Sequence, residues 1–224
     1  MVEPVFPQRP TDARAEILSV EWLFEPLWPG TRLIASVDSG DVTLNDELGE
    51  RVTDLPEATE ILATSVMAGH AVVDGVWSAQ PFVGDGSLAR TWADTIAQEG
   101  LAGEIPDPLE VERRRAFVAV DLIELDHEPL LDVPFQERRR LLESVIDESV
   151  QVRLSPVVKH PLSGWLIGWK ANGFTHYLAK HMNSRYQPGE RSDEWLKVEL
   201  RTDRPRGMMS RLTGTRDRVR RIRD

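Results

Sequence analysis

The chain has 224 residues, of which 41% are hydrophobic and 29% are charged, an ordinary composition for a globular protein. This length suits one large domain or two small ones. No apolar run approaches the length of about 18 residues that a membrane helix needs, so we expect no membrane partner. The absence of cysteine excludes disulfides and thiolate metal sites, and it fits a cytoplasmic protein.

The formal net charge of −10 is unevenly distributed along the chain. Residues 201–224 hold nine arginines and three aspartates, a local charge of +6, so the remaining chain carries −16. An acidic body repels a phosphate backbone, whereas an arginine-rich end attracts one. Such an end is also typical of a flexible, solvated terminus, so both interpretations stay open.

The N-terminal third predicts a loose arm followed by antiparallel strands. Prolines 4, 7 and 10 disfavour regular pairing, so residues 1–18 are expected to form an arm. A hairpin turn at Ser39-Gly40 is flanked by apolar segments, which predicts strands over residues 19–25, 31–37 and 42–44. A helix then opens near Pro56, with Asp54 as its expected cap, and ends by Gly69.

Strands and helices alternate in the rest of the chain. Strands are predicted over residues 71–77 (with a kink at Asp74-Gly75), 116–125, 150–158, 174–179 and 195–200. Helices are predicted over residues 87–99, 134–146 and 163–171, and residues 100–112 read as a linker. On the helix at 134–146 we expect Phe135, Leu141, Leu142 and Val145 to point inward and Arg138 to Arg140 to be solvated. Intermixed strands and helices with early hairpins indicate the α+β class.

The most informative stretch is Glu25-Pro26-Leu27-Trp28-Pro29-Gly30-Thr31-Arg32. It resembles the nucleotide-binding motif Glu-Pro-Lys-x-Asp-Gly-x-Arg of ATP-dependent DNA ligases. Further segments resemble the later motifs of that family, in the same order. They are Val72–Val76, Phe117–Glu124 with Leu130–Leu142, Ala179–Lys180 with Ser184–Trp195, and Trp195–Glu199.

The resemblance implies a ligase-type nucleotidyltransferase fold, similar to ATP-grasp, with two mainly antiparallel sheets flanked by helices. It implies an adenylation-like domain over residues 19–202, between the arm at 1–18 and an arginine-rich tail at 203–224. It also implies ATP or AMP and Mg²⁺ as ligands, and DNA or a protein of DNA repair as the partner.

The residue types that the family reaction requires are missing at their matched positions. In the family a lysine amine attacks the α-phosphate of ATP, and the matched Leu27 carries no heteroatom. Carboxylates associated with the metal align with Val76 and Thr175, which cannot replace them. The adenine-stacking ring aligns with Val120, and the motif aspartate and the final lysine align with Pro29 and Glu199. The resemblance therefore predicts no catalytic residue in the usual place.

Four charged residues survive at matched positions and are the predicted nucleotide-binding set: Glu25, Arg32, Lys180 and Lys197. Each also has a purely structural alternative. Glu25, on a strand, would pair with a neighbouring cation. Lys180 would be solvated, and Arg32 and Lys197 would be surface or sheet-edge charges. Trp28, on the loop, is either an ordinary core residue or a plug in the former pocket. The histidines show no metal-ligand spacing, so no metal site is predicted.

Three functions follow from these observations. The leading hypothesis is a catalytically inactive ligase-like fold that acts as a nucleotide-, DNA- or protein-binding module. The first alternative is an active ATP-dependent DNA ligase or nucleotidyltransferase with a relocated nucleophile, for which the candidates are Lys159, Lys170, Lys180 and Lys197. The second alternative is an accessory protein that binds DNA ends through its arginine-rich tail.

Overall fold

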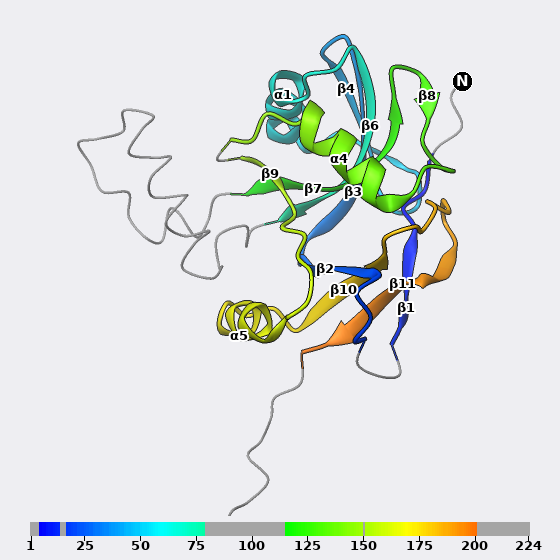
Figure 1. Ribbon diagram of the computed structural model, residues 1–224. Helices are drawn as coiled ribbons and strands as arrows, with labels where there is room; N and C mark the ends of the chain where they lie inside the picture. Colours follow the sequence, from blue (N-terminus) through cyan, green and yellow to red (C-terminus); the bar gives the residue numbers. More distant parts are fainter. Residues whose placement is uncertain (1–4, 14–16, 79–114, 150, 201–224) are drawn as a thin grey trace, which may run out of the picture.

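A computed structural model describes residues 5–13, 17–78, 115–149 and 151–200, which form two β-sheets and the helices packed on them (Figure 1). The smaller sheet has the order β1 (Arg9–Asp12), β11 (Arg191–Glu199), β10 (His176–His181), β2 (Trp22–Pro26). The larger has the order β5 (Arg51–Val52), β4 (Asp41–Asn45), β3 (Thr31–Asp38), β6 (His70–Ser78), β7 (Ala116–Leu125), β8 (Glu128–Pro129). A further strand, β9 (Val152–Leu154), pairs with β7.

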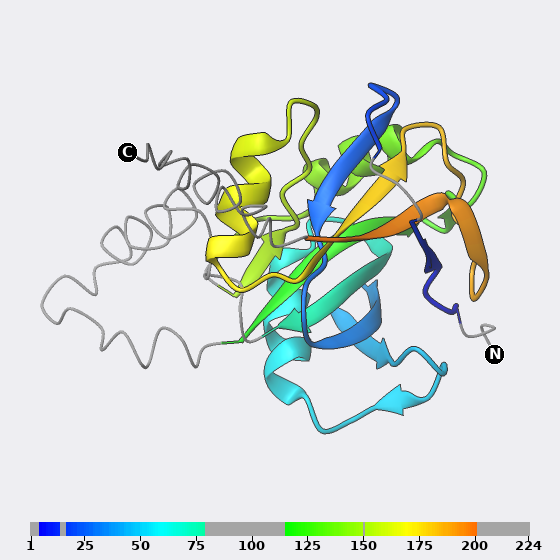
Figure 2. The same cartoon turned by 90° about the horizontal axis from the view of Figure 1, so that it is seen from below.

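The pairing is antiparallel except between β1 and β11 and between β7 and β9. Helices α1 (Pro56–Ser65) and α4 (Phe135–Val145) contribute Leu62 and Leu142 to the core of the larger sheet. Helix α5 (Ser163–Ala171) packs Trp169 into a second core with residues of β2 and β10. In the view from below, the yellow helix α5 lies apart from the cyan helix α1 (Figure 2). The predicted α+β class and the two flanked, mainly antiparallel sheets are confirmed.

The long central strands β6 and β7 are bent where the sequence predicted a kink. Their register shifts between Asp74 and Gly75, as in a β-bulge. A Cβ atom on Gly75 would lie 2.2 Å from the ring of Phe117, so the packing at this bend requires glycine. Beyond the bend, Val76 shares a hydrophobic cluster with Phe24 of β2 and Tyr177 of β10.

The expectation of a loose arm over residues 1–18 is wrong for Arg9–Asp12. These residues form β1, which pairs in parallel with β11, although β1 contains Pro10. The pairing is possible because β1 is an edge strand, where proline needs no donor on its free side, and because the register shifts beside Pro10. Pro56 does sit in the first turn of α1, but the predicted cap at Asp54 is wrong, since no side chain caps this helix.

The expectation that Arg138 and Arg139 are solvated is also wrong. Arg138 is 0% exposed and Arg139 is 8% exposed, whereas the side chain of Arg140 is 69% exposed as predicted. Arg138 donates to both oxygens of Asp121 on β7, at 2.9 and 2.8 Å. Its remaining nitrogen donates to the carbonyls of Val133 and Ser184. The guanidinium is buried because every side of it finds an acceptor.

Some predicted elements differ in their bounds from the observed ones, and others lie outside the described residues. The strand predicted over 150–158 is regular only over Val152–Leu154, and Val158 forms an isolated bridge with Phe24. The predicted helix at 87–99, the linker at 100–112 and the tail at 203–224 lie outside the described residues. Within the described ranges, none of the helices has the length and apolarity required to span a bilayer.

Candidate functional site

The turn between β2 and β3 carries the residues that match the ligase motif. Leu27 follows β2 directly, and its backbone N–H donates to the carbonyl of His176 at 3.1 Å. Gly30 has a φ of 141°, and a Cβ there would lie 2.3 Å from the carbonyl oxygen of Trp77. Glycine therefore lets this turn lie directly against β6. On this tightly held turn the side chain of Leu27 is half-buried, and its match to the family nucleophile stays a prediction.

Trp28 packs into the apolar core between elements of both sheets. It is 7% exposed and shares a cluster with Val76 and Val118 of the larger sheet and Phe174 before β10. Its ring meets Phe174 edge to face at 5.1 Å between centroids, and its Nε1 donates to Ser155 Oγ at 2.9 Å. Both the apolar and the polar parts of the indole are satisfied. Trp28 is therefore a core residue of the fold, and its role as a plug in a former nucleotide pocket stays a prediction.

Glu25 and Lys180 are brought together by the pairing of β2 with β10. Lys180 Nζ lies 2.6 Å from Glu25 Oε1, and the side chains are 1% and 2% exposed. The ammonium also donates to the carbonyl of Val120 at 3.2 Å and lies 4.0 Å from the ring centroid of Trp195. Neither oxygen of Glu25 makes a well-aligned hydrogen bond to a described residue, so this contact is an ion pair above all. The pairing expected for Glu25 is confirmed, and the expected solvation of Lys180 is wrong.

Arg32 is held in a separate network on the larger sheet. Its Nε and Nη2 each lie 2.5 Å from the carboxylate of Asp74 on β6. Burial alone would lower the pKa of Arg32, but the charge of Asp74 and the hydrogen bonds to it raise that pKa above its usual value. Tyr186 completes the network by donating to Asp74 Oδ2 at 2.7 Å. Burial and then the charge of Asp74 raise the pKa of Tyr186 well above its usual value, so the phenol keeps its proton.

Lys197 lies apart from the other three predicted residues. It is on β11, where it pairs with Asp12 of β1 at 3.0 Å in a solvent-accessible position. The hydrogen bond from Lys197, followed by its charge, lowers the pKa of Asp12. The structure thus joins Glu25 to Lys180 but gives Arg32 and Lys197 other partners. Nucleotide binding by these four residues stays a prediction.

The family of this chain is shown by the match of its sequence to a known domain. The model of the ATP-dependent DNA ligase domain matches residues 9–199. The chain belongs to the ATP-dependent DNA ligase domain family.

Relatives of this ligase-family chain include whole ligases and repair enzymes. The DNA ligase of Thermococcus onnurineus is 27% identical over 212 residues, which cover 88% of this chain and 36% of the relative. The multifunctional non-homologous end joining DNA repair protein LigD of Mycobacterium tuberculosis is 29% identical over 183 residues, covering 82% of this chain and 22% of the relative. The chain therefore spans about a third or less of these relatives.

Solved ligase structures show the same fold. The ligase domain of Mycobacterium tuberculosis LigD aligns with a TM-score of 0.60 at 27% identity, over 87% of this chain and 59% of that one. A mycobacterial DNA ligase D in complex with ATP aligns with a TM-score of 0.62 at 27% identity, over 87% of this chain and 60% of that one. Against these structures, the predicted ligase-type nucleotidyltransferase fold is confirmed.

The described residues do not fit the Mg²⁺ ion that the ligase reaction uses. A magnesium site needs carboxylate and water oxygens, and the two matched positions hold buried Val76 and exposed Thr175. The carboxylate of Glu25 is buried and already faces Lys180. We therefore derive no catalytic step through a metal at this site.

Several buried polar and charged residues near the site were not predicted from the sequence to be partners of one another. Asp74, Asp121, Arg138 and Tyr186 are buried, and their hydrogen bonds join β6 to the loop at Tyr186 and β7 to α4. The group of Asp38, His70 and His127 at another end of the larger sheet was not predicted either. A signal was present for Asp74 and Asp121, because each is a charged residue inside an otherwise apolar strand.

Proposed function

We propose that this ligase-family chain is catalytically inactive in AMP transfer and acts as a binding module in DNA repair. The observation that carries the proposal is Leu27, a hydrocarbon side chain at the position of the family nucleophile. Its support comes from Trp28, which packs beside Val76 and Val118 where an open nucleotide cleft would require space. A family member can keep the fold after losing the chemistry, because fold and site are separable.

The positions of the lysines favour this proposal over a relocated nucleophile. The sequence contains Lys159, Lys170, Lys180 and Lys197, and the structure describes all of them. The amine of Lys180 is buried in an ion pair, and that of Lys197 pairs with Asp12 at the sheet edge. Lys159 and Lys170 are exposed. An amine that is engaged by a neighbouring carboxylate is not free to attack the α-phosphate of ATP.

We expect no covalent adenylate on the protein after incubation with α-labelled ATP and either Mg²⁺ or Mn²⁺. The reason is that phosphoramidate formation needs an amine at the α-phosphate, and Leu27 provides none. Denaturing electrophoresis and intact-mass measurement would both report the added AMP, with a lysine-containing ligase of the family as the positive control.

The variant Leu27→Lys separates loss of the nucleophile from loss of the rest of the site. We expect it to stay unlabelled as well, because Val76 and Thr175 still offer no carboxylate for a metal. Labelling of the wild-type chain would contradict the proposal. Substituting each of the four lysines by arginine would then identify the relocated nucleophile.

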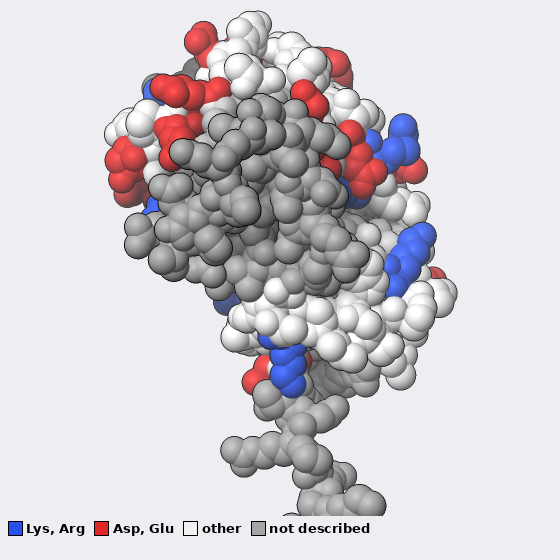
Figure 3. Space-filling view, turned by 90° about the vertical axis from the view of Figure 1, so that its left-hand side faces the viewer, with Lys and Arg blue, Asp and Glu red and all other residues white. Residues whose placement is uncertain are grey.

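The arginine-rich segment supports DNA as the partner. Residues 201–224 carry a net charge of +6 against −16 for the rest of the chain. In Figure 3, acidic side chains gather on the upper part of the described surface, and basic ones lie mainly at its right and lower edges. Since like charges repel, the body is a poor surface for a phosphate backbone, and the basic segment is the better contact. The boundary of this tail at residue 203 and a cytoplasmic location, which the lack of cysteine favours, belong to the same proposal.

We expect the affinity for duplex DNA to fall by about 1,000-fold as salt rises from about 50 mM to about 200 mM, as for a protein that neutralises about six phosphates. Deletion of residues 203–224 should abolish this binding, measured by fluorescence anisotropy. Arg140→Gln is the control, because it removes one exposed arginine of the body and should change little. Unchanged affinity after the deletion would exclude the tail as the contact.

A further inference from the structure

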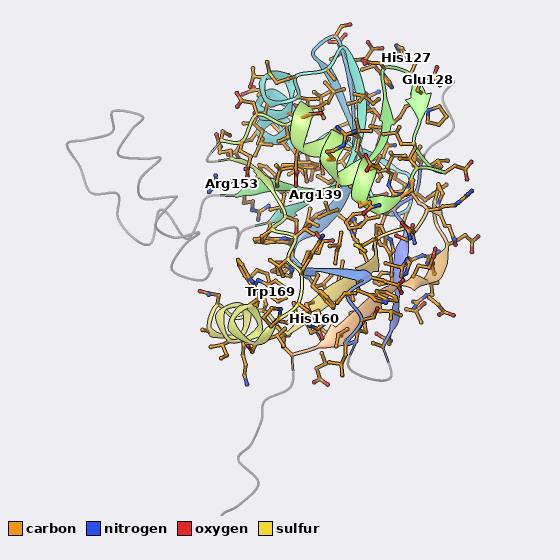
Figure 4. The ribbon with its side chains drawn as sticks, viewed as in Figure 1. His127, Glu128, Arg139, Arg153, His160 and Trp169 are labelled. Atoms are coloured by element: carbon orange, nitrogen blue, oxygen red, sulfur yellow. The ribbon has the colours of Figure 1, made fainter. Side chains whose placement is uncertain are left out.

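Two histidines and an aspartate meet at one end of the larger sheet. Asp38, His70 and His127 each offer a ligand atom, and these atoms all lie within 4.8 Å of one another. Figure 4 shows His127 at the tip of the hairpin between β7 and β8, at the opposite end of the molecule from Trp169 and His160. The group is therefore separate from the ligase-like site and independent of the function proposed for it.

Strand pairing brings the three residues to one place. Asp38 ends β3 and lies opposite His70, the first residue of β6. The chain then turns from β7 into β8 through Asp126 and His127, both with positive φ (50° and 65°). The backbone N–H of Asp126 donates to the carbonyl of His70 at 2.9 Å, which anchors this two-residue turn over the start of β6.

The hydrogen bonding of His70 leaves one ring nitrogen available. Its Nε2 lies 2.9 Å from Glu124 Oε1, and a carboxylate can only accept, so Nε2 carries the proton in the neutral ring. Its Nδ1 is buried and has no hydrogen-bond partner among the described residues. The nearest acidic atom, Asp38 Oδ2, is 4.0 Å from it. A lone pair on Nδ1 thus faces a carboxylate, an arrangement that a cation between them would stabilise.

His127 supplies a second imidazole to the same spot. Its ring stacks on that of His70 at 4.0 Å between centroids and 24° between planes. Two protonated imidazoles this close would repel each other, so protonation of both rings would not stabilise the group. A single metal ion bound by the two neutral rings and the carboxylate would stabilise it.

We propose that Asp38, His70 and His127 form a binding site for a divalent transition-metal ion of the Zn²⁺ class. Two nitrogen donors and one oxygen donor suit Zn²⁺, whereas Mg²⁺ prefers oxygen donors alone. Glu124 holds the His70 ring with Nδ1 toward the ion, the second-sphere arrangement that metal-bound histidines commonly have. Asp38 and His127 are exposed, so their side chains are free to rotate inward and bring the donors to zinc distances of about 2.0–2.2 Å.

The proposal also assigns a role to the ion. The three donors come from the end of β3, the start of β6 and the turn after β7, so one ion cross-links three segments. An ion that binds only the folded state raises its stability by mass action. At zinc concentrations about 100-fold above Kd, the melting temperature should rise by about 5–10 °C.

The test is titration of the full chain, purified with a chelator, with Zn²⁺ and with Co²⁺. We expect one ion per chain by calorimetry, cobalt d–d absorption bands of a low-symmetry nitrogen and oxygen site, and the rise in melting temperature. His127→Ala and Asp38→Asn alter exposed side chains and should each weaken zinc binding by at least about tenfold. Glu124→Gln should weaken it by about tenfold without changing the stoichiometry.

His181→Gln is the matched control. His181 also lies near a carboxylate, at 3.8 Å from Glu21, but outside the group of Asp38, His70 and His127, and its replacement should leave binding unchanged. Absence of stoichiometric zinc binding by the wild-type chain would overturn the proposal. Zinc binding that survives both His127→Ala and His70→Gln would overturn it too, because the ion would then sit elsewhere.

Discussion

Replacing Lys180 with methionine should lower the free energy of unfolding by about 3–5 kcal/mol, the usual cost of removing one member of a buried ion pair. Lys180 is 1% exposed, and its ammonium is the ion that faces the buried carboxylate of Glu25. Methionine fills a similar volume beside Phe135 and Trp195, so the change mainly removes charge. The carboxylate is left without a partner in a site that water does not reach. Urea denaturation monitored by tryptophan fluorescence would measure the loss.

The companion variants distinguish the ion pair from simple packing. Glu25→Gln should also destabilise, because it leaves the ammonium of Lys180 unpaired. The double variant Lys180→Met with Glu25→Gln should cost less than the sum of the two single changes, since neither charge is then stranded. Lys197→Met is the matched control, as its partner Asp12 is exposed, and it should have little effect. Additive single changes, or equal losses at Lys180 and Lys197, would contradict this account.

Replacing Trp28 with alanine should cost about 3–5 kcal/mol of folding stability, as for other large aromatic side chains deleted from a core. The indole is 7% exposed and packs against Phe174, and the change also strands the hydroxyl of Ser155, which is 0% exposed. Trp28→Phe keeps most of the packing and loses only the hydrogen bond to Ser155, so it should cost about 1–3 kcal/mol.

The same variants test whether Trp28 occupies the place of a nucleotide. Calorimetry with ATP and AMP should show weaker binding by the wild-type chain than by Trp28→Ala, because the deletion opens space beside Val76 and Val118. Trp165→Ala, on α5, is the control for a general effect of losing a half-buried tryptophan. Tight nucleotide binding by the wild-type chain would show that the tryptophan does not block the site.

Local patterns predicted much of the fold. The strand at Ala116–Leu125 and the helix at Ser163–Ala171 have the predicted bounds, because apolar runs and turn residues act over a few positions. The bend at Gly75 was also predictable, since glycine in an apolar strand marks a bulge or a close approach. The family was likewise readable from the order of the motifs, whereas the loss of the nucleophile at Leu27 stays a prediction.

Long-range partners decided the remaining features. Arg138 was expected in solvent because a charged side chain is costly to bury, and only the fold supplies Asp121 and two carbonyls to offset that cost. Lys180 is buried for the same reason, through Glu25 on the neighbouring strand.

By itself, the sequence determined most of the described elements and the family, because both depend on residue type and local spacing. The tertiary structure alone decided which charges are buried as pairs, how Trp28 fills the space between the sheets, and that His70 and His127 stack beside Asp38. These contacts join residues far apart in the chain, and their free energies depend on distance and burial, which no local pattern specifies.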